Sequence, residues 1–337
     1  MRSSLLRRII YLVLTIAFIW YGLTHKEEIR ELLHAFSQGS WLWLIVAALI
    51  QVAFFAVVIL MTKFAFRVVD MKRKFLELLP LVFGSIFVNV LAPTAGQSGA
   101  ILYADDAAKR NESTPKAIIG NLISTISGYV AFSFILFFAL IYLRSYGLLN
   151  DFEVAGAMIF VLWTVLPGIL IFTAYKSQKF TVKILDFLYF LYRKILKIIR
   201  KKKRYDKEWS TKIASELFEA AESIIKNKLD LIGTLLLGFI AHAINILCLY
   251  VIFEAFAMEI YFGALIAGYA VGEMVRVISP HPEGVGVTEA AMAVLFASFG
   301  VPLISATAIS LIFRAYNFWI PLGFGFVLLR RLRSFSN

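Results

Sequence analysis

The chain has 337 residues, 60% of them hydrophobic, and a formal net charge of +12. This apolar fraction is well above the roughly 45–50% of a soluble domain, which excludes an ordinary water-soluble fold. The single cysteine, Cys248, excludes a disulfide framework and a thiolate metal site. In so apolar a chain, the positive charge favours anionic lipid headgroups as its counter-charge rather than nucleic acid.

Six apolar segments are candidates for full membrane spans, since a helix needs about 20 such residues to cross a hydrocarbon core. They predict an all-α polytopic membrane protein. The first has basic flanks like a secretory signal, but no small-residue cleavage site follows it, so we interpret it as a retained span. The expected spans are Ile9–Thr24, Trp41–Thr62, Ala117–Leu143, Val154–Tyr175, Leu229–Phe253 and Pro302–Leu329.

The density of Lys and Arg between these spans predicts the topology. Cytoplasmic loops of membrane proteins are enriched in both residues. By this rule we expect a multi-pass protein of the cell (inner) membrane with both termini cytoplasmic. The segments expected inside are 63–74, 109–116 and 176–228, and those expected outside are 25–40, the turn around residue 144, and 254–259.

Two further apolar segments, 75–108 and 260–300, each begin and end on one predicted side of the membrane. Pro and Gly interrupt each of them near its middle. The arm Ala100–Ala108 would cover less than half of a ~30 Å core at about 1.5 Å per residue. We therefore predict two re-entrant helical hairpins with the interruptions at their tips. Such interrupted segments in matching halves are typical of transport sites.

The hairpins divide the chain into two similar halves. One is predicted to enter from inside and the other from outside, so the halves are expected to be inverted repeats with a site between them near the midplane. The expected units are an N-terminal span with an external loop (1–40), the first repeat with hairpin 75–108 (41–143), a linking span (144–175), a cytoplasmic connector (176–228) and the second repeat with hairpin 260–300 (229–333).

The connector contains apolar residues at helical spacing from Phe180 to Ile198, with basic residues between them. This pattern predicts a basic amphipathic helix that binds an anionic lipid surface through residues 179–204. A positive-inside signal without a specific ligand explains the same pattern. Nucleic acid is not expected as a partner, because no recognisable binding module surrounds the basic run.

Ionisable residues at membrane depth are rare and usually face a cavity or a partner. Here they gather around the second interruption. Glu273 and Arg276 are three residues apart, so they share a helix face and could pair. One interpretation is an ion-pair network that holds the hairpin tip; the other is that arginines bind a lipid phosphate while glutamates meet a cationic group or a coupling proton. The candidates are Glu273, Arg276, His281, Glu283, Glu289 and, in the last span, Arg314.

The glycines of both interruptions permit close backbone approach, and the helices expected after Gly99 and Gly286 would offer free N–H groups to an anion. His242 and three membrane asparagines, at positions 121, 245 and 317, are expected to form interhelical hydrogen bonds. No HExxH, GxSxG or P-loop motif occurs, so neither a cofactor nor a metal is predicted. The remaining candidates for the substrate site are Pro93, Gly96, Gln97 and Gly284.

The second interruption carries a recognisable motif, Pro280-x-Pro282-x-Gly284-x-Gly286-x-x-Glu289. Together with Arg314 and Phe318-Trp319-x-Pro321-x-Gly323, it resembles the membrane domain of the lysylphosphatidylglycerol synthase family, and Pro93-x-x-Gly96 matches that family's first Pro-Gly hairpin. The resemblance covers roughly Leu5 to Arg331. Gln97 stands where the family usually has an acidic residue, and Glu283 replaces a common Gly.

Family members attached to a cytoplasmic aminoacyltransferase domain are similar to flippases for aminoacylated phosphatidylglycerol, and stand-alone members are linked to envelope lipid or lipid-linked sugar pathways. The sequence holds no aminoacyltransferase domain, so the resemblance does not imply synthase activity. The leading hypothesis is a flippase for an anionic phospholipid or a polyprenyl-phosphate-linked lipid, whose headgroup enters between the hairpin tips. The alternatives are an integral-membrane transferase with Glu283 or Glu289 as general base, and a non-catalytic assembly factor. No residue pattern indicates an oligomeric state.

Overall fold

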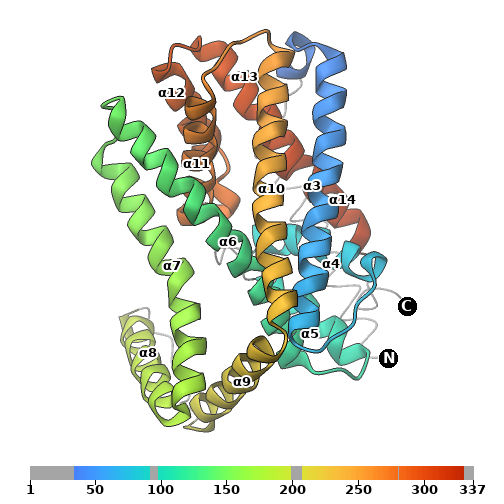
Figure 1. Ribbon diagram of the computed structural model, residues 1–337, viewed down its shortest axis with the longest axis vertical. Helices are drawn as coiled ribbons and strands as arrows, with labels where there is room; N and C mark the ends of the chain where they lie inside the picture. Colours follow the sequence, from blue (N-terminus) through green and yellow to red (C-terminus); the bar gives the residue numbers. More distant parts are fainter. Residues whose placement is uncertain (1–33, 92–97, 199–206, 280, 330–337) are drawn as a thin grey trace.

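The computed structural model describes residues 34–91, 98–198, 207–279 and 281–329 (Figure 1). Every regular element in these ranges is a helix, which confirms the predicted all-α class. The predicted first span, Ile9–Thr24, lies outside them. Five described helical segments are long and apolar enough to cross a membrane: Trp41–Val68 (α3), Thr114–Ser145 (α6), Asp151–Lys176 (α7), Lys228–Ala255 (α10) and Leu303–Leu329.

The last of these spans is not one regular helix. It consists of Leu303–Arg314 (α13), a π-helical segment Ala315–Trp319, and Ile320–Leu329 (α14). π-helical turns are rare in proteins and often occur at functional sites. This one directly follows Arg314 and contains Asn317, so the irregular turn lies where the span carries its polar side chains.

The two predicted hairpins are pairs of short helices. The first contains Phe75–Leu91 (α4) and Ala100–Lys109 (α5), and the second Phe262–Ile278 (α11) and Val287–Ser298 (α12). At 17 residues, α4 and α11 are each about 25 Å long, shorter than a ~30 Å hydrocarbon core. These lengths agree with a re-entrant path, which stays a prediction. The tip residues Pro93, Gly96, Gln97 and Pro280 lie outside the described residues.

The helices of the two halves follow one another in the same order. Helices α10, α11, α12 and α13 begin 187 to 189 residues after α3, α4, α5 and α6, respectively. The packing is repeated too: α4 lies against α14 as α11 lies against α6, and α5 packs on α6 as α12 packs on α13. Helices α3 and α10 lie side by side through the middle of the bundle (Figure 1).

Loops predicted to share a side of the membrane meet at the same end of the bundle. At one end, Asn227 Nδ2 donates to the carbonyl oxygen of Val68 at 2.9 Å, which joins two predicted cytoplasmic segments. At the other, the Ser40 N–H donates to the carbonyl oxygen of Ala255 at 2.8 Å, which joins two predicted external segments. The charge pattern therefore sorts the loops into two sets that agree with the fold.

The connector forms two helices, Gln178–Ile198 (α8) and Lys207–Lys226 (α9), at the lower end of the bundle in Figure 1. Helix α8 packs against α7 and α9, and Ser210 Oγ donates to Asp186 Oδ1 at 2.6 Å. Phe180 and Phe187 are exposed on α8, as expected of a helix that binds an interface. The basic run 200–204 lies outside the described residues.

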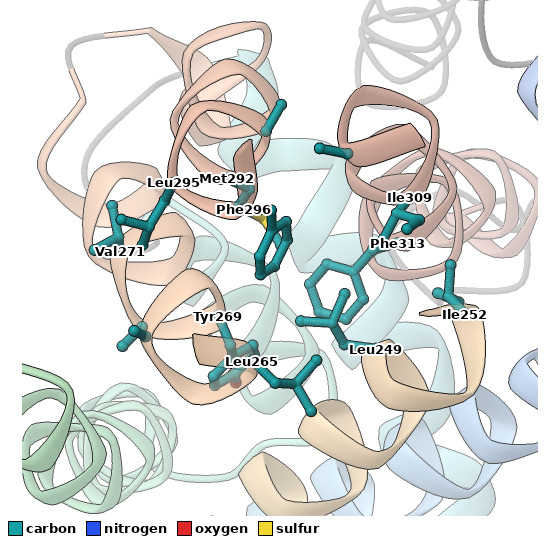
Figure 2. Close-up of a cluster of buried hydrophobic side chains, with 14 of the residues drawn as sticks. Leu249, Ile252, Leu265, Tyr269, Val271, Met292, Leu295, Phe296, Ile309 and Phe313 are labelled. Carbon is teal, nitrogen blue, oxygen red and sulfur yellow. The ribbon is translucent and has the colours of Figure 1, made fainter. Parts of the chain in front are cut away.

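The larger of two buried clusters joins α10, α11, α12 and α13 (Figure 2). Phe296 of α12 lies over Gly268 of α11, and a Cβ added at this glycine would lie 2.0 Å from the Phe296 ring. Within a membrane, helices associate through close van der Waals packing, which small residues permit. The two helices of the second hairpin are therefore closely packed against each other.

Candidate functional site

A cavity of about 270 Å³ lies between the two halves, bounded by α3, α4, α6, α10, α11 and the last span. Its wall contains four side chains that are charged at neutral pH: Glu273, Arg276, Glu283 and Arg314. A concave site with converging polar groups is the usual form of a small-molecule site. The uncharged polar wall residues are Thr62, Ser85, Asn89, Tyr103, Asn121, Ser124, Thr125, Tyr129, His242, Asn245 and Asn317.

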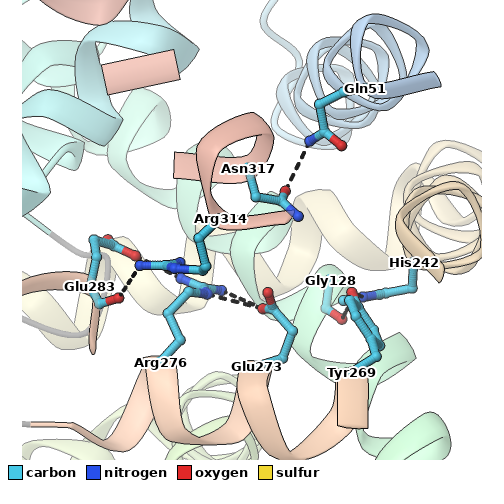
Figure 3. A network of polar contacts seen from close by, with 9 residues as sticks. All are labelled: Gln51, Gly128, His242, Tyr269, Glu273, Arg276, Glu283, Arg314 and Asn317. Carbon is cyan, nitrogen blue, oxygen red and sulfur yellow. Dashed lines mark hydrogen bonds and ion pairs between the residues drawn. The ribbon is translucent and has the colours of Figure 1, made fainter. Parts of the chain in front are cut away.

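Arg276 is held by two carboxylates, one from its own helix and one from the hairpin tip (Figure 3). Its Nε and Nη2 donate to Glu273 Oε2 at 3.0 and 2.9 Å. Its Nη1 donates to Glu283 Oε2 at 2.8 Å. The predicted pairing of Glu273 with Arg276 is confirmed, and it follows directly from their spacing of three on α11.

Arg314 is more deeply buried and holds the start of α12. Its Nε donates to Glu289 Oε1 at 2.9 Å, and the two side chains are only 3% and 8% exposed. Its Nη2 donates to the carbonyl oxygen of Glu283 at 2.8 Å. The guanidinium carbon lies 4.7 Å from the ring centroid of Phe318, one turn further along the span, a distance typical of a cation–π contact.

Glu283 links the two arginines, since its carboxylate meets Arg276 and its carbonyl meets Arg314. Its φ of +50° lies in the left-handed region, between the helix α11 and two glycines that also have positive φ, Gly284 and Gly286. A non-glycine residue in this conformation costs of order 1–3 kcal/mol and persists only where its surroundings hold it. Here the two arginines provide that restraint.

The positive charges of Arg276 and Arg314 are therefore already compensated by carboxylates of the protein. Two arginines face three glutamates, Glu273, Glu283 and Glu289, which gives a net charge of −1 when all five side chains are ionised. The sequence left open whether these residues form a structural ion-pair network or bind phosphate. The network is present, so any anion that binds Arg276 or Arg314 has to displace a contact made by the protein.

His242 of α10 connects three helices. Its Nε2 lies 3.1 Å from the carbonyl oxygen of Gly128 on α6, and its Nδ1 lies 2.6 Å from the hydroxyl of Tyr269 on α11 (Figure 3). A carbonyl only accepts, so Nε2 carries the hydrogen and Nδ1 accepts from the tyrosine. Gln51 Nε2 likewise donates to Asn317 Oδ1 at 2.9 Å. The expected interhelical hydrogen bonds of His242 and Asn317 are therefore present.

Several predicted site residues contribute to the shape of the hairpins rather than to the described cavity wall. His281 is exposed at the tip, and Glu289 contacts Arg314 from outside the wall. The N–H of Gly99 donates to Asn89 Oδ1 at 2.7 Å, which closes the first hairpin behind an asparagine that does line the cavity. Helices α5 and α12 begin directly after Gly99 and Gly286, as predicted.

The polar stripe of α6 was not recognised as part of the site from the sequence. Asn121, Ser124, Thr125 and Gly128 all line the cavity. They recur at spacings of three and four in an otherwise apolar span, so they share one helix face. This periodicity is a signal that could have identified the face before the structure was known.

Comparison with known proteins agrees with the motif. Residues 8–325 match the family model described as the lysylphosphatidylglycerol synthase TM region. The chain belongs to this family. The match includes the residues of both hairpins and of the cavity wall.

Three curated relatives of the chain are described as membrane proteins. A UPF0104 membrane protein of Pyrococcus horikoshii is 26% identical over 270 residues, covering 77% of this chain and 78% of the relative. One of Methanocaldococcus jannaschii is 22% identical over 289 residues, covering 85% of this chain and 83% of the relative. A third, from Methanothermobacter thermautotrophicus, is 36% identical over 90 residues, which is 27% of each chain. Their names identify them as membrane proteins and state no activity.

Proposed function

We propose that this protein is a flippase-type transporter that moves an anionic phospholipid or a polyprenyl-phosphate-linked lipid between leaflets. The observation that carries the proposal is a cavity inside an apolar bundle with two arginines in its wall, Arg276 and Arg314. On insertion scales an arginine at the centre of a membrane helix costs roughly 2.5–3.5 kcal/mol, so such residues mark functional sites by default. Membership of a family named for a phospholipid supports a lipid substrate.

The size of the cavity favours entry of the headgroup alone. At about 270 Å³ it is slightly smaller than the roughly 300–1,000 Å³ pockets that hold drug-sized ligands. A phosphate with a short polar substituent fits this volume, whereas two acyl chains do not. The chains would stay in the bilayer along the apolar faces of the spans while the headgroup crosses through the protein.

Binding would proceed by exchange of anions at Arg276. The lipid phosphate replaces the Glu283 carboxylate at Nη1, while Glu273 keeps its contacts with Nε and Nη2. The guanidinium is well suited to this exchange, because its donors match phosphate and carboxylate oxygens alike. The displaced Glu283 then leaves its strained conformation and becomes free to meet a cationic group of the headgroup.

The repeated order and packing of the halves support a mechanism of alternating access. In transporters built from inverted repeats, one half rocks against the other around a site near the midplane. Helices of both halves line this cavity, including α4 of the first hairpin and α11 of the second. We propose that the hairpins are re-entrant from opposite faces of the inner membrane, that the termini are cytoplasmic, and that residues 179–204 bind the anionic leaflet.

The test is lipid exchange in proteoliposomes. Purified protein is reconstituted with headgroup-labelled phosphatidylglycerol or a labelled polyprenyl phosphate, and a membrane-impermeant quencher reports the label in the outer leaflet. We expect faster exchange than in empty vesicles, and loss of most of this excess with Arg276→Gln. Arg67→Gln is the matched control, because Arg67 pairs with Asp230 at 3.0 Å and is 46% exposed away from the cavity. Absence of exchange with both lipids would overturn the proposal.

The same vesicles separate the alternatives. Mass spectrometry of the recovered lipid would reveal a covalently altered headgroup if the protein were a transferase. An assembly factor would give neither exchange nor product, and cells that carry Arg276→Gln or Arg314→Gln would then keep the phenotype of the wild type. Exchange of chemically unchanged lipid is the outcome that the flippase proposal requires.

A further inference from the structure

His242, Tyr269 and Asn245 form a hydrogen-bonded chain beside the arginine network. The Tyr269 hydroxyl donates to His242 Nδ1 at 2.6 Å, and the Asn245 side chain hydrogen-bonds the same hydroxyl. Asn245 is only 3% exposed, yet its Oδ1 has no hydrogen-bond partner among the described residues. A buried acceptor without a partner is costly and requires an explanation.

The chain has a second arrangement in which the imidazole holds one more proton. A protonated Nδ1 donates to the Tyr269 oxygen, so the hydroxyl has to donate elsewhere. Turning the Asn245 amide by half a rotation presents Oδ1 to that hydroxyl and supplies the acceptor. Each arrangement leaves one amide atom unpaired, so the asparagine by itself favours neither protonation state.

The charged groups around the ring belong to the proposed lipid site. Glu273 and Arg276 on α11 both act electrostatically on His242, and Arg314 on the last span acts on Glu273. Tyr129 on α6 lines the same cavity. The carboxylate attracts an imidazolium and the guanidinium repels it, so the added negative charge of a lipid phosphate at Arg276 raises the affinity of His242 for a proton.

We propose that His242 is a proton-binding site that couples lipid movement to a transmembrane pH gradient, with Tyr269 and Asn245 as its relay. The inference rests on the proposed lipid transport at the neighbouring arginines. Proton uptake at Nδ1 reverses the hydrogen bond to Tyr269 within the second half, and it turns the Nε2 contact with Gly128, which joins the two halves, into a charge-assisted hydrogen bond. Histidine suits the role because its ordinary titration range lies between about pH 5 and 8.

The first test compares lipid distribution in the proteoliposomes with and without an imposed gradient. One proton moved per lipid shifts the steady-state ratio of labelled phosphatidylglycerol between leaflets by up to about tenfold per pH unit, and reversing the gradient reverses the shift. We expect the shift in the wild type and its loss in His242→Gln. His34→Gln, an exposed histidine beside Gln38, serves as the matched control and keeps the shift.

Variants of Asn245 test the relay separately from His242. Asn245→Leu removes the second acceptor and should abolish the gradient-dependent shift, whereas Asn245→Ser replaces the amide oxygen by a hydroxyl that can still accept, and should retain part of the shift. The ratio with and without gradient is taken within each preparation, so a variant with slower exchange is still interpretable. Exchange in the wild type that ignores the gradient would overturn the inference and leave the lipid transport intact.

The second test does not depend on transport. Imidazole ¹⁵N resonances of the protein in nanodiscs are followed from pH 8 to pH 5, and His242 is assigned by its loss in His242→Gln. We expect a ring protonated only at Nε2 at high pH and at both nitrogens at low pH. A ring that keeps a single proton throughout would overturn the inference, whether or not the vesicles show exchange.

Discussion

The two hairpins share their length and place in the repeat, but their charges lie at opposite ends. In the second hairpin the charged side chains lie at the tip, where Glu283 meets Arg276 in the middle of the bundle. In the first they lie at the base, where Arg110 pairs with Glu77 at 3.1 Å beside the predicted cytoplasmic loops. The described part of the first tip is closed by a neutral contact, from the Gly99 N–H to Asn89.

The comparison indicates that the ion pairs of the two hairpins have different roles, although the hairpins occupy equivalent places in the two halves. A partly exposed ion pair such as Arg110 with Glu77, whose side chains are 19% and 32% exposed, contributes little because water solvates both partners. A buried pair such as Arg314 with Glu289 is costly to break, so it fixes the geometry of the second hairpin at the start of α12. We infer that the second hairpin supplies the reactive groups of the site and that the first supplies a fixed wall.

The base of the first hairpin is held by a network of several ion pairs. Arg73, whose side chain is 1% exposed, pairs with Glu112 at 2.5 Å and Asp106 at 3.3 Å. Asp106 also forms an ion pair with Arg110, with Nε and Oδ2 2.9 Å apart. These contacts join the loop before α4 to α5 and the turn after it, so the ends of the hairpin cannot separate independently.

Removing one partner of the most buried ion pair at the second hairpin should have the largest effect of the variants considered. Arg314→Leu leaves Glu289 buried without its guanidinium, which costs about 3–5 kcal/mol of stability. We expect a large fall in the unfolding temperature of the detergent-purified protein. The double variant Arg314→Met, Glu289→Leu should recover most of it, because no buried charge is left unpaired. Equal unfolding temperatures for single and double variants would contradict this account of the second tip.

The next effect tests the close packing of the two helices of the first hairpin. A Cβ at Gly99 would lie 2.3 Å from Ser85 Cβ, so Gly99→Ala should destabilise the first hairpin by about 1–3 kcal/mol. Gly168→Ala on α7 is the control, since no atom lies within 4 Å of its added Cβ. The measurement is thermal unfolding of both variants against the wild type. If the two variants behaved alike, the close approach of α4 and α5 would not be a feature of the folded protein.

A smaller effect tests whether the Glu283 carboxylate at the second tip competes with the phosphate of the ligand for Arg276. Glu283→Gln removes the carboxylate that an incoming phosphate has to displace, so binding of a short-chain phosphatidylglycerol should tighten roughly tenfold, in line with the loss of one charge-assisted hydrogen bond. Glu77→Gln, at the base of the first hairpin, should leave binding unchanged. The dissociation constants of the wild type and both variants for this lipid are measured by calorimetric titration. Weaker binding to Glu283→Gln would mean that this glutamate assists the ligand instead of competing with it.

The fold was largely predictable because membrane helices follow from local composition. The spans Trp41–Thr62 and Val154–Tyr175 are found as α3 and α7 with ends extended by a few residues. The pairing of Glu273 with Arg276 was predictable for the same reason, since a spacing of three fixes a shared face. The remaining site contacts join distant residues, and no local pattern specifies them: Arg314 meets Glu289 across 25 positions and His242 meets Gly128 across 114.

The smallest predicted effect concerns the base of the first hairpin and its dependence on pH. The backbone N–H of Lys74 donates to the Glu77 carboxylate at 3.0 Å, and chiefly for this reason the pKa of Glu77 is lowered from its ordinary value of 4.5, with a further contribution from Arg110. The side chains are 32% and 19% exposed, so Glu77→Gln should cost less than about 1 kcal/mol at pH 7.

The sign of the pH dependence follows from the direction of that shift. A carboxylate whose pKa is depressed by folding stabilises the protein fully above the unfolded value, and loses the contribution as pH falls through the folded value. The gap in unfolding temperature between wild type and Glu77→Gln should therefore be constant at neutral pH and close below about pH 4.5. If the gap widened on acidification, the ionised Glu77 carboxylate would not stabilise the base of the first hairpin. The ion pairs of Arg73 would then be the remaining evidence that this base is held by charge.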